Sequence, residues 1–173
     1  MKVRTQAGFT LIELLIVVAI IGIIAAIAVP GLLRARMSGN EASAIGSMRA
    51  INTAEQNYSQ KCNGYATSLQ ELRVAGNFLS PDLTQGAVGT AAVKSGFTVQ
   101  LTVGAVTAPI AAPAGCLLTD VGYKASAAPL SAGSTGTRAF ATDEQGTIWQ
   151  NNAVPPVIPA QPFAVGANTG PIQ

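Results

Sequence analysis

The chain has 173 residues, with 10 Lys or Arg, 8 Asp or Glu and no His. Without histidine it lacks the commonest general base and the ligands of an HExxH metal site, so neither an enzyme nor a cofactor is expected. The formal net charge of +2 comes from Lys2 and Arg4 near the N-terminus, because acidic and basic residues balance after them. Binding to nucleic acid through phosphate contacts is therefore not expected.

The first predicted element is an apolar helix. Residues 9–29 read FTLIELLIVVAIIGIIAAIAV, and Glu13 is their one charged residue. About 20 apolar residues are enough for a helix to cross a bilayer. A carboxylate within hydrocarbon costs about 3 kcal/mol on insertion scales, so Glu13 is expected to have a partner. The alternative is an ordinary secretory signal peptide, cleaved after the A-x-A sequence that ends at Ala28.

The helix is predicted to continue through residues 31–62, which contain no further proline and many good helix formers. Apolar residues recur at helical spacing in this part of the chain and predict one face that packs on a sheet. These residues are Leu33, Met37, Ala44, Met48, Ile51 and Tyr58.

The residues that follow the helix are predicted to form an antiparallel sheet of three or four strands. Residues 63–72 indicate a turn and a short helix, and the Gly-rich residues 76–95 are expected to be irregular. Strand patterns occupy residues 96–105, 117–127, 137–142 and 147–150. The link DEQG between the last two strands carries too few carboxylates for a calcium site and is expected to be a hairpin turn.

The C-terminal residues 151–173 contain five prolines and little helical or strand period, so they are predicted to form an extended tail, either held on the head or mobile. Cys62 and Cys116 lie far apart and do not form a C-x-x-C motif. A disulfide between them is expected if this part of the chain lies outside the cytoplasm, and the alternative is two buried thiols.

The N-terminal sequence resembles that of type IV pilins and of the pseudopilins of type II secretion. The resemblance rests on the basic leader, the Gly8-Phe9 junction, Thr10, Glu13 at its offset from the junction, and Pro30. It covers about the first 35 residues, and it implies an α+β fold in which a long N-terminal helix packs on a small antiparallel sheet, in the shape of a lollipop. It further implies that a prepilin peptidase cleaves between Gly8 and Phe9 and methylates the new amine of Phe9.

The resemblance also implies roles for three helix residues. Glu13 is expected to pair with the Phe9 amine of a neighbouring subunit, and this pairing sets the register of a filament. The Phe9 amine of the same chain, four residues away, is the alternative partner. Gly22 and Pro30 are expected to be flexible points of the helix, with a mild permanent kink as the alternative.

The predicted organisation has five parts. They are a cleaved leader (1–8), a transmembrane and polymerisation helix (9–30), an amphipathic continuation of that helix (31–62), a head (63–150) and a Pro-rich tail (151–173). The predicted function is that of a structural subunit of a type IV pilus, serving attachment, motility or DNA uptake. The alternatives are a type II secretion pseudopilin, or a minor pilin with an adhesive or DNA-binding head.

The expected partners are other copies of the chain, the prepilin peptidase, an inner-membrane platform protein and an assembly ATPase. Before assembly the chain is expected in the inner membrane as a single-pass protein with its head outside the cytoplasm. After assembly it is expected in an extracellular pilus.

Overall fold

A computed structural model describes residues 8–84, 91–105, 107–117 and 119–172. The predicted leader therefore lies, except for Gly8, outside the described residues. The chain divides into two compact units, Met1–Arg36 and Met37–Gln173. The first unit contains the apolar part of helix α1 (Leu11–Cys62), and the second contains the rest of α1 and all other elements.

The predicted long N-terminal helix is confirmed. Helix α1 is continuous over 52 residues and contains Pro30 in its interior. It begins at Leu11, two residues later than Phe9.

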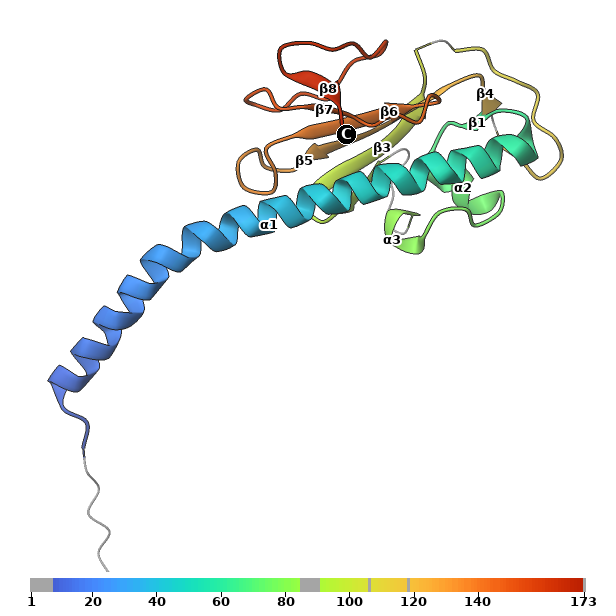
Figure 1. Ribbon diagram of the computed structural model, residues 1–173. Coiled ribbons are helices and arrows are strands. Elements are labelled where there is room, and N and C mark those ends of the chain that lie inside the picture. The colour runs from blue at the N-terminus through green and yellow to red at the C-terminus, as the bar shows by residue number, and fades with distance from the viewer. Residues whose placement is uncertain (1–7, 85–90, 106, 118, 173) are drawn as a thin grey trace, which may run out of the picture. The chain divides into compact units, whose positions relative to one another are not determined.

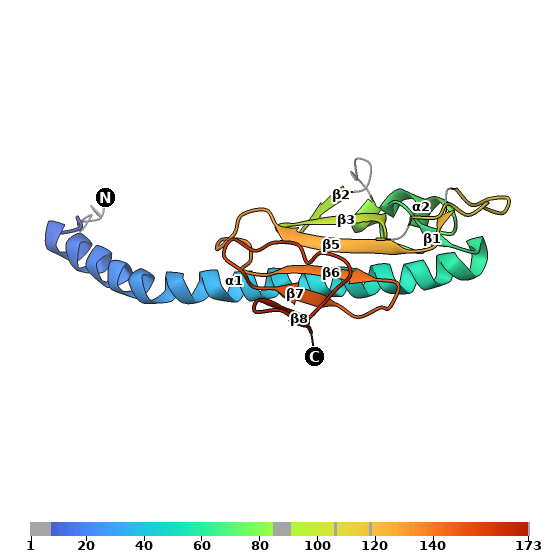
Figure 2. The ribbon, with the colours of Figure 1, turned by 90° about the horizontal axis from the view of Figure 1, so that it is seen from above.

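The second unit contains a six-stranded antiparallel sheet, which lies along the C-terminal half of α1 (Figure 1). Its strands, in spatial order, are β2 (Ala91–Lys94), β3 (Phe97–Val103), β5 (Tyr123–Pro129), β6 (Ala139–Asp143), β7 (Trp149–Asn151) and β8 (Thr169–Pro171). Figure 2 shows this order from β2 at one edge to β8 at the other. The remaining elements are the short helices α2 (Leu69–Val74) and α3 (Pro81–Thr84), and the paired strands β1 (Tyr65–Ala66) and β4 (Thr119–Asp120).

One hydrophobic core joins α1, α2 and the sheet in the second unit. The predicted apolar face of α1 is largely correct, because Ala44, Met48, Ile51 and Tyr58 are buried in this core. Leu33, which belongs to the first unit, is instead 52% exposed. Fully buried side chains on the other elements complete the core: Leu69, Leu72, Phe97, Val99, Leu101 and Phe140.

The sheet is larger than predicted. The expected strand at residues 117–127 is replaced by β4 and β5, which belong to two different sheets. Residues 76–95, expected to be irregular, contain α3 and β2. Near the end of the chain β8 pairs with β7, with Gly170 opposite Gln150. Strands β4 and β8 are too short to show a pattern of their own, and each pairs with a strand that lies well before it in the sequence.

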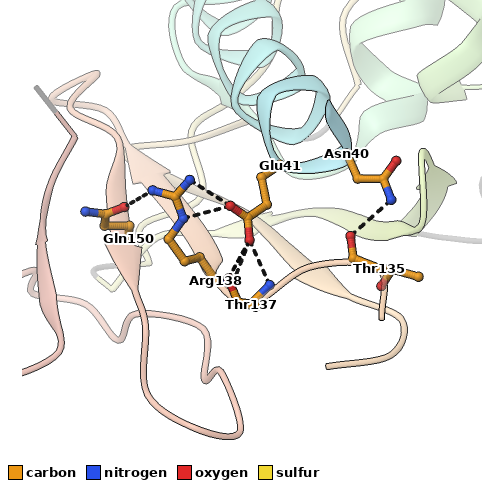
Figure 3. A network of polar contacts seen from close by, with 6 residues as sticks. All are labelled: Asn40, Glu41, Thr135, Thr137, Arg138 and Gln150. Atoms are coloured by element: carbon orange, nitrogen blue, oxygen red, sulfur yellow. Dashed lines mark hydrogen bonds and ion pairs between the residues drawn. The ribbon is translucent and has the colours of Figure 1, made fainter. Parts of the chain in front are cut away.

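A partly buried polar network around the buried Glu41 fastens α1 to the start of β6 (Figure 3). Glu41 accepts hydrogen bonds from the backbone N–H groups of Thr137 and Arg138, at 2.7 and 3.2 Å, and from the Thr137 hydroxyl at 2.9 Å. Arg138 also donates to Gln150 Oε1 at 2.8 Å. Nearby, Asn40 donates to the carbonyl of Thr135 at 3.1 Å.

Cys62, the last residue of α1, forms a disulfide with Cys116. This is the pairing expected for a head outside the cytoplasm. The two cysteines are 54 residues apart, and the loop that they close contains β1, α2, α3, β2 and β3. The disulfide therefore ties the end of the helix to the segment that precedes β4.

Candidate functional site

The candidate site lies at the start of α1, where Thr10 and Glu13 hydrogen-bond to each other. Glu13 Oε2 accepts from the backbone N–H of Thr10 at 2.9 Å and from its hydroxyl at 2.6 Å. In return, the Thr10 hydroxyl oxygen lies 3.3 Å from the backbone nitrogen of Glu13 and accepts its hydrogen. This reciprocal pattern is a capping box, in which Thr10 is the N-cap residue and Glu13 the third helical residue.

The capping box gives Glu13 a partner, Thr10, that was not predicted from the sequence. The signal was present in the sequence, because Thr-x-x-Glu before an apolar run is the pattern of a capping box. Both hydrogen bonds that Glu13 accepts from Thr10 end on Oε2, and among the described residues no donor contacts Oε1. One oxygen of Glu13 is therefore available to a second partner.

The Gly8-Phe9 junction precedes the helix. Gly8, Phe9 and Thr10 lie outside α1 and are exposed, and the side chain of Phe9 is 83% exposed. Since the helix begins only at Leu11, the peptide bond between Gly8 and Phe9 lies in non-helical backbone. Phe9 is joined to Gly8 in this chain, so its nitrogen is an amide and cannot act as the cationic partner of Glu13.

The helix that follows is long and apolar enough to cross a membrane. Its most apolar window of 18 residues has a mean hydropathy of 3.1, and none of that window is buried. Large apolar side chains are exposed all around the helix in the first unit, from Leu11 to Leu33. A helix that is apolar on all sides requires an apolar environment, which is either lipid or other helices.

Gly22 and Pro30 lie within the continuous helix. A Cβ atom added at Gly22 would meet nothing within 4 Å, so packing within the chain does not require glycine at this position. Their role as flexible points stays a prediction.

Within the described residues, no group of three or more His, Cys, Asp or Glu side chains is arranged to hold a metal ion. At the end of β6, the side chain of Asp143 accepts a hydrogen bond from the backbone N–H of Gln145 at 3.1 Å, and Gly146 in the following link has a positive φ of 76°. These features are those of a turn.

Comparisons with known proteins point to the same N-terminal segment. Residues 3–29 match the prokaryotic N-terminal methylation motif. The chain is 40% identical over 68 residues to the type IV major pilin protein PilA of Myxococcus xanthus. These 68 residues are 39% of this chain and 31% of that protein.

Two further relatives match over similar lengths. One is the type II secretion system core protein G of Aeromonas hydrophila, 35% identical over 72 residues, which are 42% of this chain and 50% of that protein. The other is the type IV wide pilus major component PilA4 of Thermus thermophilus, 40% identical over 65 residues, which are 38% of this chain and 50% of that protein. The chain thus spans about a third to a half of the length of these relatives. It carries the prokaryotic N-terminal methylation motif, and it is related in sequence to type IV pilins and to the core protein G of type II secretion.

Proposed function

We propose that this chain is the precursor of a structural subunit that assembles into a type IV pilus. The observation that carries the proposal is Glu13, the single charged residue of the exposed apolar residues 9–29. Among the described residues, one of its carboxylate oxygens has no hydrogen-bond donor, and it lies close in sequence to the exposed Gly8-Phe9 junction. The relation to pilins supports it. The proposed role is structural and requires no catalytic reaction.

Processing supplies the missing partner of Glu13. Cleavage between Gly8 and Phe9 gives Phe9 a cationic amine, and methylation of that amine leaves it charged. Glu13 then keeps its cap on Thr10 through Oε2 and binds the Phe9 amine of a neighbouring subunit through Oε1. Because an unpaired charge in an apolar environment is costly, only the register that pairs every Glu13 with an amine is stable.

Before assembly, the apolar part of α1 anchors the precursor in the inner membrane, with the head outside the cytoplasm. Assembly transfers that helix from lipid to contacts with the helices of other subunits. Gly22 and Pro30 are the points where we expect the helix to yield in that transfer. Directed extraction from the membrane requires an assembly ATPase and a platform protein, in addition to the prepilin peptidase.

A subunit of a type II secretion system is the second candidate. The observation that favours it is the match to core protein G, which extends over half of that protein. Both candidates use the same processing and the same pairing of Glu13. They differ in abundance and in whether fibres reach the cell surface, so electron microscopy of cells that express the chain at its native level separates them.

The test of processing is the intact mass and N-terminal sequence of the protein purified from its native cell envelope and from the sheared surface fraction. We expect a chain that begins at a methylated Phe9. A chain that begins at Val29 would show cleavage by an ordinary signal peptidase and would overturn the proposal.

The test of assembly is the Glu13→Gln variant. It keeps the size of the side chain and its ability to accept a hydrogen bond, but it loses the charge that pairs with the amine. We expect normal membrane insertion and a loss of filaments of at least tenfold. The matched control is Glu144→Gln, which removes an exposed carboxylate of the head. Filaments at the wild-type level with Glu13→Gln would contradict the role of Glu13.

A further inference from the structure

The head contains a carboxyl group that the proposed filament does not explain. Glu55 lies on the part of α1 that packs in the head, and its side chain is fully buried. Its Oε2 accepts a hydrogen bond from the backbone N–H of Ala66 in β1 at 2.9 Å. Its Oε1 has no hydrogen-bond partner among the described residues.

A second unpartnered atom lies one helical turn away. The hydroxyl of Tyr58 is also buried and makes no well-aligned hydrogen bond among the described residues, although the backbone N–H of Leu117 lies near it. Buried polar atoms are nearly always paired, so two such atoms at positions i and i+3 of one helix call for a physical reason.

The surroundings of Glu55 are acidic and aromatic. The ionisable groups near enough to interact electrostatically with it are Glu71 from α2, Tyr58 from α1 and Tyr123 from β5. Tyr123 donates its hydroxyl hydrogen to Asn52 Oδ1 at 3.0 Å, so it is already engaged. The ion pairs of the described residues join Lys94 to Asp82 and Arg138 to Glu41, and neither supplies a cation to Glu55.

The carboxylate of Glu71 makes a negative charge on Glu55 more unfavourable. The Glu71 carboxylate holds the start of α2 by accepting hydrogen bonds from the backbone N–H of Thr67 at 2.7 Å and from the Thr67 hydroxyl at 2.9 Å. The segment from β1 to the end of α2 is therefore fastened by two carboxyl groups, Glu55 from the side of α1 and Glu71 within the segment. Two negative charges here repel each other, while a proton on Glu55 removes the repulsion.

We propose that Glu55 acts as a proton-dependent latch, which holds the β1–α2 segment, residues 65–74, against α1 while its carboxyl group is protonated. When Glu55 loses the proton, its negative charge lies in the core near Glu71 without a compensating cation. Opening of the segment then lets water reach the Glu55 carboxylate. This proposal concerns the head alone and does not rest on the proposed filament.

The direction of the effect follows from the pKa of the group. Burial, with a smaller contribution from the charge of Glu71, raises the pKa of Glu55 from 4.5 to about 8, against the opposing effect of the Ala66 N–H. In the open segment the carboxyl returns to its ordinary pKa. The closed state then binds one more proton than the open state between about pH 4.5 and 8, so closure weakens as the pH rises through this range. Below and above that range Glu55 adds no further dependence of the closure on pH.

The test is hydrogen exchange of the full-length protein in detergent micelles between pH 5 and 9, expressed as protection factors for each segment. We expect the protection of residues 65–74 to fall about tenfold per pH unit up to about pH 8 and then to level off. Glu55→Gln, a neutral residue of the same shape, is expected to abolish this dependence. The matched control Glu144→Gln is expected to keep the wild-type dependence.

Three outcomes would overturn the latch. In the first, the protection of residues 65–74 does not change with pH. In the second, the Glu55→Gln variant keeps the pH dependence of the wild type. In the third, the central strands β3 and β5 lose as much protection as residues 65–74, which would indicate global unfolding. Since Glu55→Gln can fail to fold, the ¹³C shift of the Glu55 carboxyl in the wild-type protein provides a second readout. A midpoint near 4.5 would also overturn the proposal, whereas a midpoint above 7 supports it.

Discussion

Glu41 of α1 and Arg138, the residue before β6, form an ion pair across 97 positions of sequence. One carboxylate oxygen of Glu41 lies 2.8 Å from Arg138 Nε and 2.7 Å from Nη2 (Figure 3). Glu41 is 5% exposed, whereas the Arg138 side chain is 36% exposed, so a buried carboxylate on the helix is paired with a partly exposed guanidinium group beside the sheet.

Removing the cation of this pair is expected to destabilise the head. Arg138→Met leaves the buried carboxylate of Glu41 without its guanidinium group, and we expect the free energy of unfolding to fall by about 2 kcal/mol. The measurement is urea unfolding of the full-length protein in micelles, followed by near-UV circular dichroism. The control is Lys94→Met, which breaks the more exposed pair with Asp82 and is expected to cost less than about 1 kcal/mol. Equal losses in the two variants would show that the burial of Glu41 does not matter.

Glu41 also predicts how the stability of the head depends on acid. Burial opposes the charged form, but hydrogen bonds from Thr137 and Arg138 and the charge of Arg138 outweigh it, so the pKa of Glu41 lies below its ordinary value of 4.5. A carboxyl with a lowered pKa stabilises the fold above its unfolded-state pKa, and this contribution is lost as the pH falls through the folded-state pKa. We therefore expect the free energy of unfolding to drop below about pH 4.5, with a smaller drop in Glu41→Gln. An identical acid profile in the variant would assign the drop to other groups.

The disulfide is expected to contribute strongly to stability. Closing a loop of 54 residues between Cys62 and Cys116 contributes about 4 kcal/mol in the chain-entropy model. We expect the double variant Cys62→Ala/Cys116→Ala to lose at least this amount, because Cys62 is fully buried and its replacement also leaves a small cavity. The oxidised and reduced wild-type proteins, compared in the same urea titration, separate the effect of the crosslink from that of the cavity.

Gly136 is expected to tolerate no side chain. A Cβ atom there would lie 2.5 Å from Phe97 Cζ, and Phe97 is fully buried and cannot move away. Gly136→Ala should therefore lower the free energy of unfolding by about 1–3 kcal/mol. The matched control is Gly46→Ala on the exposed side of α1, where a Cβ meets nothing within 4 Å. This control should raise the stability by about 0.5–1 kcal/mol, because alanine favours a helix more than glycine does.

The hydroxyl of Thr10 is expected to fix the start of α1. Thr10→Val removes the hydroxyl that donates to Glu13 and accepts from its N–H, so we expect the first turn to lose about 1 kcal/mol of stability. Thr10→Ser keeps the hydroxyl and is expected to behave as the wild type. The measurement is the amide exchange of Glu13 and Leu14 in micelles, because these two N–H groups are bonded to the hydroxyl and the carbonyl of Thr10. Equal exchange in both variants would contradict the capping role.

Much of the candidate site was predictable from the sequence, because its features are local. The length of the apolar run, its single carboxylate and the Gly8-Phe9 junction are visible in consecutive residues. The capping box of Thr10 and Glu13 joins residues three apart, and the apolar face of α1 follows from the period of a helix. Each of these features is determined by residues that lie close together in the sequence, and the capping box and the apolar face need only residues within one or two helical turns.

The tertiary structure alone decided which polar groups of the head are buried and which segments complete the sheet. Glu41 and Glu55 look alike in the sequence, yet the first meets Arg138 and the second meets Glu71 and Ala66. In the same way, Thr169–Pro171 becomes a strand only because β7 offers it an edge. The physical reason is that the burial of a charge, and the hydrogen bonds of a short strand, depend on partners that the chain brings together from distant positions.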